Sequence, residues 1–380
     1  MKIKKKPLLL CMGTRPEIIK MAPVYHELKS RKLPVQLLHT GQHKDLAEPM
    51  YEFFSLKPDH SLLLDRTANT LEHLSALLIE QIGALIADVA PKAVLVHGDT
   101  TSALMAAMAA FYQKIPVAHV EAGLRSHNSY DPFPEEKNRE LIARLAYWHF
   151  APTEKAAANL IAEGVPRQQI HVVGNTVIDA IAYGQNRLRS HPQLIEPSAV
   201  EMAKKLKDRK IILVTAHRRE NWGAPLHAMA SAILALIKEH PDLAVVWPVH
   251  ANPEVKAAVH TVLGALDPAL AQRVFLLPPI PYPALLDLLS RAWLVLTDSG
   301  GIQEEAASFH VPVLVLRETT ERPELIDIGA GRLVGTDQHK IVDAVSTLLA
   351  WPQQYDAMRA TRNPFGDGQA AKRIVQAMVA

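Results

Sequence analysis

The feature that most constrains the fold of this chain is a regular alternation of short apolar runs with longer helix-like segments, maintained from end to end. Runs such as Ala93–His97 and Val117–Glu121 have the length and composition of buried strands, whereas Leu71–Val89 has the length of a helix. This alternation is typical of βαβ units, in which helices cover a parallel sheet. Because 380 residues exceed one ordinary domain, we expect an α/β protein of two Rossmann-like, doubly wound domains.

The alternation is interrupted in Gln185–Pro197 and resumes at Lys210, so we expect an N-terminal domain at residues 1–184 and a second at residues 198–365. The expected strands are Pro7–Met12, Val35–Thr40, Ala93–His97, Val117–Glu121, Trp148–Ala151 and Ile170–Val173 in the first domain, and Ile211–Thr215, Ala244–Val249, Val274–Leu277, Leu294–Thr297 and Val313–Leu316 in the second. Open sheets bind ligands beyond the carboxyl ends of their strands. We therefore expect two domains facing across a cleft, with the chemistry in strand-to-helix loops.

Composition excludes several classes of function. The formal net charge is only +2, and the cluster of four lysines within the first six residues is interpreted as a solvated end, not a nucleic-acid site. The apolar run Leu8–Met12 is too short for a signal peptide, and Ala103–Tyr112 is too short to span a bilayer. The single cysteine, Cys11, allows no disulfide within the chain. We expect a soluble, cytoplasmic protein that binds neither nucleic acid nor membrane.

Charged residues follow the first strands of the chain. Arg15 and Lys20 belong to a loop and helix start that can attract an anion, although a capping loop with solvated charges is an alternative. The loop is not a G-x-G-x-x-G fingerprint, so no dinucleotide is implied. Asp99 and Glu121 stand at the ends of two strands expected to be neighbours, where carboxylates would perturb each other's pKa. Asp99 could instead cap a helix, and Glu135, at a later helix start, could merely complement the helix dipole.

The second domain contributes hydrogen-bond donors. His217 follows a strand within a group of arginines, and a neutral core histidine is the alternative. Gly300 and Gly301 let backbone N–H groups approach a diphosphate, Ser299 adds a hydroxyl, and an ordinary helix start is the alternative. Arg322 lies in a loop suited to bidentate phosphate recognition. No acidic pair or Cys/His spacing indicates a metal site, and no cofactor is expected.

These residues alone predict a two-domain α/β enzyme for an anionic, phosphorylated ligand. Over nearly its whole length, the chain also resembles the bacterial, non-hydrolysing UDP-N-acetylglucosamine (UDP-GlcNAc) 2-epimerases, which have the GT-B fold. The segments that carry the resemblance are GTRPEIIKMAP from Gly13, TGQH from Thr40, HGDTTS from His97, VEAGLRS from Val120, PFPEEKNR from Pro132, GNTVID from Gly174, TAHRREN from Thr215, PVHANP from Pro248, DSGGIQEEA from Asp298, TTERPE from Thr319 and NPFGDG from Asn363.

The resemblance implies reversible conversion of UDP-GlcNAc to UDP-ManNAc through elimination of UDP, a 2-acetamidoglucal intermediate and re-addition, by a homodimer. It implies that the catalytic groups are Asp99, Glu121, Glu135 and His217. It also implies that the substrate-binding residues are Arg15, Lys20, Ser299, Gly300, Gly301, Glu305 and Arg322. Residues 366–380 resemble the family's closing helix, which crosses back to the first domain. A GT-B glycosyltransferase and a non-catalytic nucleotide-sugar sensor remain alternatives.

Bacterial members of this family can bind a second UDP-GlcNAc as an activator. The residues matching that site are Gln42, His43, Arg218 and His250. Two positions depart from it, because Asp45 stands where a glutamine is found and Ala68 replaces an arginine. We therefore expect weak or absent activation.

Overall fold

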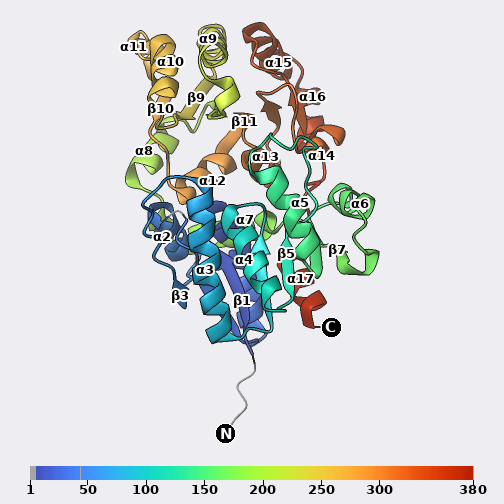
Figure 1. Cartoon of the computed structure of the whole chain (residues 1–380). Coiled ribbons are helices and arrows are strands. Elements are labelled where there is room, and N and C mark those ends of the chain that lie inside the picture. Colours follow the sequence, from blue (N-terminus) through green and yellow to red (C-terminus); the bar gives the residue numbers. More distant parts are fainter. Residues whose placement is uncertain (1–5, 43, 380) are drawn as a thin grey trace. The chain divides into compact units, whose positions relative to one another are not determined.

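The computed structural model describes residues 6–42 and 44–379, without the side chains of residues 44–46. His43 and the lysines before Lys6 lie outside the described residues. The chain forms two compact units, one of Met1–Tyr183 with Phe365–Ala380 and the other of Gly184–Pro364. Each unit contains one parallel sheet with helices interleaved along the chain, so the expected α/β, doubly wound fold class is confirmed (Figure 1).

The sheet of unit 1 has seven strands in the order β3-β2-β1-β4-β5-β6-β7. The strands are β1 (Leu8–Met12), β2 (Val35–His39), β3 (His60–Ser61), β4 (Ala93–His97), β5 (Val117–Val120), β6 (Trp148–Ala151) and β7 (Ile170–Val172). The helices are α1 (Arg15–Ser30), α2 (Lys44–Phe53), α3 (Leu71–Val89), α4 (Thr101–Tyr112), α5 (Glu135–Leu145), α6 (Glu154–Ala162), α7 (Thr176–Ser190) and α17 (Ala370–Val379). The winding direction reverses between β1 and β4, so the loops after these strands meet where such sheets bind ligands.

The sheet of unit 2 has six strands in the order β10-β9-β8-β11-β12-β13. The strands are β8 (Lys210–Thr215), β9 (Leu243–Pro248), β10 (Val274–Leu277), β11 (Ala292–Thr297), β12 (Val313–Val315) and β13 (Gly331–Leu333). The helices are α8 (Pro197–Lys205), α9 (Ala224–Glu239), α10 (Pro253–Leu263), α11 (Pro268–Ala271), α12 (Tyr282–Arg291), α13 (Gly300–Ser308), α14 (Pro323–Asp327), α15 (Gln338–Ala350) and α16 (Pro352–Arg359). Here the reversal lies between β8 and β11, and their following loops carry His217 and Ser299.

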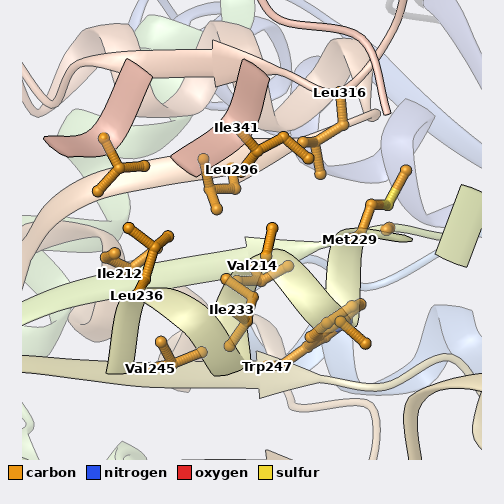
Figure 2. Close-up of a cluster of buried hydrophobic side chains, with 14 of the residues drawn as sticks. Ile212, Val214, Met229, Ile233, Leu236, Val245, Trp247, Leu296, Leu316 and Ile341 are labelled. Carbon is orange, nitrogen blue, oxygen red and sulfur yellow. The ribbon is translucent and has the colours of Figure 1, made fainter. Parts of the chain in front are cut away.

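Strand and helix side chains form the core of unit 2, part of which Figure 2 shows. Trp247 of β9, Ile233 of α9 and Leu296 of β11 are each at most 1% exposed. Burying one large apolar side chain of this kind contributes about 1.5–3 kcal/mol. The core therefore holds the strand ends, from which the site loops depart, in a fixed arrangement.

The last helix of the chain is part of unit 1. α17 packs against α1, and Ile374 and Val375 are fully buried. The carboxylate of Asp179 in α7 accepts the N–H groups of Ala370 and Ala371, at 3.2 and 3.0 Å. A side chain from an earlier helix thus satisfies the first donors of α17, which otherwise lack partners within a helix.

The structure differs from the sequence expectations at a few element ends. β5 stops at Val120 because Glu121 has a positive φ of 66°, which is incompatible with a strand. α7 continues to Ser190, into the segment where a break was expected. The two- and three-residue strands β3 and β13 were not expected. Among the described residues, no helix has the length and apolar character needed to cross a membrane.

Candidate functional site

Glu121 is held by a cation and an amide at the end of β5. Its carboxylate forms an ion pair with the Nζ of Lys20, from α1, and accepts a hydrogen bond from Asn175 Nδ2 at 3.2 Å. The Nε2 of His97 lies 3.7 Å away. Glu121 has a left-handed backbone, which is unusual for a residue other than glycine and is frequent at functional sites. The structure therefore brings together two of the predicted site residues, Lys20 and Glu121.

Asp99 follows β4, which pairs directly with β5 as expected. Its carboxylate accepts the Nε–H of Arg139 at 2.8 Å, and a second nitrogen of the same guanidinium lies 2.6 Å from the same oxygen. Asn138 Nδ2 donates to the Asp99 carbonyl at 2.8 Å. The capping role considered for Asp99 belongs instead to Thr100, whose hydroxyl accepts the N–H of Ala103. The carboxylate of Asp99 is thus held in an ion pair with Arg139 of α5.

The first turn of α5 contains two glutamates with different environments. Glu135 begins the helix and is half-buried. Glu136 is fully buried, accepts the N–H groups of Ser126 and His127 at 2.9 Å each, and receives Arg139 at 2.9 Å. Burial acts to raise the pKa of Glu136, but these hydrogen bonds and Arg139 outweigh it and lower the pKa. Glu136 therefore orders the loop before α5 and orients the arginine that holds Asp99.

Glu17 is a buried carboxylate that the sequence analysis did not assign. It accepts the N–H groups of Gly13 and Thr14, at 3.0 and 2.8 Å, and the hydroxyl of Thr100 at 2.8 Å. Burial raises its pKa, against the lowering effect of these hydrogen bonds. Glu17 thereby joins the β1–α1 loop to the β4–α4 loop. Arg15, which lies between Thr14 and Glu17 in the sequence, is exposed. The Thr14-x-x-Glu17 spacing of a capping box was the signal that could have revealed it.

In unit 2, Asp298 organises the loop that carries His217. Asp298 is fully buried and accepts the N–H groups of His217 and Arg218, at 3.0 and 2.9 Å, and Asn221 Nδ2 at 2.9 Å. Its pKa is lowered, because bonds to His217, Arg218 and Asn221 outweigh the opposing effect of burial. The His217 ring lies near Asp298, with Nδ1 3.3 Å from Oδ1, and its side chain is 44% exposed. The alternative of a core histidine at His217 is therefore wrong.

Three arginines gather around one glutamate in the same unit. Glu321 accepts Arg218 at 2.7 Å and Arg317 at 2.5 Å, and the charge of Arg322 also acts on it. Burial opposes ionisation, but the three guanidinium groups lower the pKa of Glu321 to about 2. Arg322 itself is held by Glu304 of α13, at 2.5 Å. The predicted phosphate-binding arginine is therefore buried, and Glu304 fixes its orientation.

The start of α13 lies against this arginine cluster. Ser299 occupies the N-cap position without a side-chain capping bond, and Gly300 and Gly301 form the first turn. A Cβ atom at Gly300 would lie 3.3 Å from Glu321 Oε1 and 3.5 Å from Arg322 Cζ. A side chain at Gly300 would therefore crowd Glu321, and glycine leaves room for the helix N-terminus beside this cluster. Glu305, one turn further, is buried.

Residues of the expected second site fall in both units. In unit 1, Gln42 Oε1 accepts the N–H and the hydroxyl of Ser102, at 3.1 and 2.7 Å. In unit 2, the His250 ring stacks on His217, with centroids 6.1 Å apart, and Arg218 is bound to Glu321. The pKa of His250 is lowered by burial and by the neighbouring His217. Within the described part of the chain, no group of three or more His, Cys, Asp or Glu residues is arranged to hold a metal ion.

Comparisons with known proteins cover almost the whole chain. The family model described as UDP-N-acetylglucosamine 2-epimerase matches residues 26–379. The UDP-N-acetylglucosamine 2-epimerase of Escherichia coli K12 is 43% identical over 372 residues, which are 98% of each protein. The crystal structure of UDP-GlcNAc 2-epimerase from Neisseria meningitidis bound to UDP-GlcNAc is 40% identical, with a TM-score of 0.89 over 98% of this chain and 99% of that one. An S. aureus MnaA–UDP structure is 39% identical, with a TM-score of 0.88 over 98% and 96% of the chains.

Proposed function

This chain belongs to the UDP-N-acetylglucosamine 2-epimerase family, and from that membership we propose that it interconverts UDP-GlcNAc and UDP-ManNAc by eliminating UDP and adding it back. It is an isomerase, with the α/β fold of GT-B type. The observation that carries the proposed mechanism is the pair of carboxylates at adjacent strand ends, Asp99 and Glu121, each held by a cation.

The proposed chemistry needs both a base and a stabilised leaving group. The C2–H of GlcNAc has no adjacent carbonyl, so removal of its proton must be concerted with, or closely coupled to, cleavage of the C1–O bond to UDP. The electron pair of C2–H then forms the C1=C2 double bond of 2-acetamidoglucal, and UDP departs with the electrons of the C1–O bond. Protonation of C2 on the opposite face and return of a UDP oxygen to C1 give the epimer. Ionisable groups are therefore required on both faces of the sugar.

The carboxylates of unit 1 suit the proton transfers. Arg139 fixes the orientation of Asp99, and Lys20 with Asn175 fixes that of Glu121. Glu135 opens the helix that carries Arg139 and supplies a third acid. Such orientation matters because proton transfer requires hydrogen-bond distance between the base and the carbon acid.

The groups of unit 2 suit the leaving group. We assign UDP to the start of α13, where Gly300 and Gly301 offer backbone N–H groups and Ser299 offers a hydroxyl, with Glu305 following in the same helix. Arg322 supplies a guanidinium that Glu304 already orients. His217 lies on the loop that the buried Asp298 organises. Arg15, the exposed first residue of α1, is assigned to the same substrate.

We also propose that the enzyme is a homodimer in the cytoplasm. Apolar exposure on unit 1 supports the dimer, because Phe111 and Tyr112 of α4 and Tyr147, which follows α5, are all more than half exposed.

The deciding experiment is proton NMR of the purified enzyme with UDP-GlcNAc in D2O. We expect UDP-ManNAc to form with deuterium at C2 in both epimers. A glycosyltransferase would turn over only after an acceptor sugar is added, and a nucleotide-sugar sensor would bind UDP-GlcNAc without changing it. Either result would contradict the proposal.

A further inference from the structure

His119 is a buried histidine with one defined hydrogen bond. It lies in β5, two residues before Glu121, and is 0% exposed. Its Nε2 lies 2.7 Å from the carbonyl oxygen of Gly98. A carbonyl only accepts, so Nε2 must carry the hydrogen. The other ring nitrogen, Nδ1, is buried and has no hydrogen-bond partner among the described residues.

This environment keeps the ring neutral. Protonating Nδ1 would place a charge where nothing accepts its hydrogen, and burial lowers the pKa of His119 to about 3. The neighbouring histidines and Arg125 contribute to this lowering of the pKa, while the bond to Gly98 acts to raise it. At neutral pH, His119 is therefore a permanent donor through Nε2 and is not suited to carrying a proton.

The acceptor of this bond belongs to the turn that carries Asp99. Gly98 has a φ of 66°, and its N–H donates to the Val120 carbonyl at 2.9 Å. Both backbone polar groups of Gly98 are thus bound to β5, one by Val120 and the other by the His119 side chain. A Cβ atom at Gly98 would lie 3.8 Å from Glu121 Oε1, so the turn also lies beside the second carboxylate.

We propose that His119 is a positioning residue for the epimerisation, which fixes the turn from His97 to Asp99 against β5 through Gly98 and so sets the separation of the Asp99 and Glu121 carboxylates. This inference rests on the proposed function, in which both acids act on one sugar. Because proton transfer requires close alignment, a displacement of about 1 Å in one acid can lower turnover by about 10²-fold. Substrate binding, assigned mainly to unit 2, should change little.

The test compares variants that keep or lose the donor. In H119Q the amide nitrogen occupies the place of Nε2 and can still donate, whereas in H119N it reaches only the place of Nδ1, and H119F has no donor. We expect kcat to fall about 10- to 100-fold in H119F and H119N, and H119Q to recover to within about 5-fold of the wild type. The KM for UDP-GlcNAc and the Kd for UDP should stay within about 2-fold.

His149 provides a matched control. It pairs with His119 across β5 and β6, is also buried with its pKa lowered to about 4, and is bonded to the backbone of Ala146, beyond the last turn of α5. H149F should show a similar loss of stability with nearly unchanged kcat. Equal losses of kcat in H119F and H149F would overturn the proposal, as would an H119Q variant no more active than H119N. If H119F does not fold, H119Q and H119N still decide the question.

A second measurement separates this inference from the proposed function. In protein labelled with ¹⁵N-histidine, the ring signals absent from H119Q identify His119. They should show the Nε2–H tautomer from pH 5 to 9, whereas the Nδ1–H tautomer or a titrating ring would overturn the inference. If the wild type exchanges no C2 hydrogen in D2O, the proposed function fails. The histidine spectrum would still show whether His119 Nε2 carries the hydrogen that it donates to Gly98.

Discussion

Two of the three proposed acids of unit 1 are held by a cation of the same unit, because Lys20 binds Glu121 and Arg139 binds Asp99. The two strand-end acids and Lys20 could be expected from their place in the sequence, because parallel strands end at one edge. Arg139 could not, since an arginine in the first turns of a helix is usually solvated, and the capping-box spacing that marks Glu17 does not show that its carboxylate is buried. Their roles depend on burial, which periodicity does not reveal at a single position.

The first prediction concerns the acids and the histidine. D99N, E121Q and H217N should each lower kcat at least about 10²-fold, the range expected when an acid or base is lost. For D99N and E121Q, the Kd for UDP should stay near the wild-type value, because UDP is assigned to unit 2. Steady-state assays and UDP titrations measure both quantities.

The matched control is E27Q, which removes the same charge from an ion pair between Glu27 of α1 and Arg31, the residue after that helix. E27Q should have wild-type kcat. Wild-type turnover in D99N, E121Q or H217N would exclude that residue from the mechanism.

The second prediction concerns stability against pH. The pKa of Glu321 is about 2 in the folded protein, against an ordinary value of 4.5, so between these values the unfolded chain binds more protons. The contribution of ionised Glu321 to the free energy of unfolding is therefore fully present above pH 4.5 and is lost as the pH falls through about 2. E321Q should lower the free energy of unfolding by about 1–3 kcal/mol at pH 7, a difference that shrinks towards pH 2.

Urea unfolding monitored by tryptophan fluorescence suits this test, because four tryptophans, Trp222, Trp247, Trp293 and Trp351, lie in unit 2. The control is D343N, which changes an exposed carboxylate of the same unit. A difference between E321Q and the wild type that is equal at pH 3 and pH 7 would contradict the assigned pKa.

Among the elements, the sequence predicted those with strong patterns and missed those without. The bounds of α3 and β4 agree with the expected ranges. α3 is a long helix whose buried apolar residues recur every four positions, and every residue of the strand β4 is buried. β3, His60–Ser61, has no apolar character and exists only because it pairs with β2. The end of β5 was misplaced by one residue because Glu121 has a left-handed backbone conformation, which its residue type does not indicate.

The third prediction concerns α17, whose first N–H groups are bound by Asp179. D179A leaves these donors without a side-chain partner, and losing a helix cap costs about 0.5–2 kcal/mol. We expect faster hydrogen–deuterium exchange in residues 370–379 and a lower free energy of unfolding of unit 1. D88A is the control, because it removes an exposed carboxylate on α3 of the same unit. Equal exchange in D179A and the wild type would show that packing alone holds α17.

At the scale of the whole molecule, the fourth prediction concerns activation by a second UDP-GlcNAc. An arginine paired with its diphosphate would contribute about 1.5–3 kcal/mol, and the exposed Ala68 cannot make that contact. Asp45 would add a negative charge near the same ligand, and Arg66 is already bonded to Asn69 at 2.8 Å. We expect little or no activation.

The measurement is the reverse reaction from UDP-ManNAc, with and without a trace of UDP-GlcNAc. Turnover should begin without the trace, and A68R should increase the response to it. Turnover that starts only after the trace is added would show that the second site works despite both substitutions.

The return of residues 365–380 to unit 1 has a consequence for synthesis on the ribosome. The 181 residues of unit 2, from 184 to 364, are made between the two parts of unit 1. At about 5–20 residues per second, this takes roughly 10–40 s, during which nascent unit 1 lacks the helix that covers α1. Unit 2, although it comes later in the sequence, is thus the first to have all its residues. The apolar surface of α1 that α17 covers in the folded protein therefore stays uncovered by α17 until residues 370–379 have been synthesised.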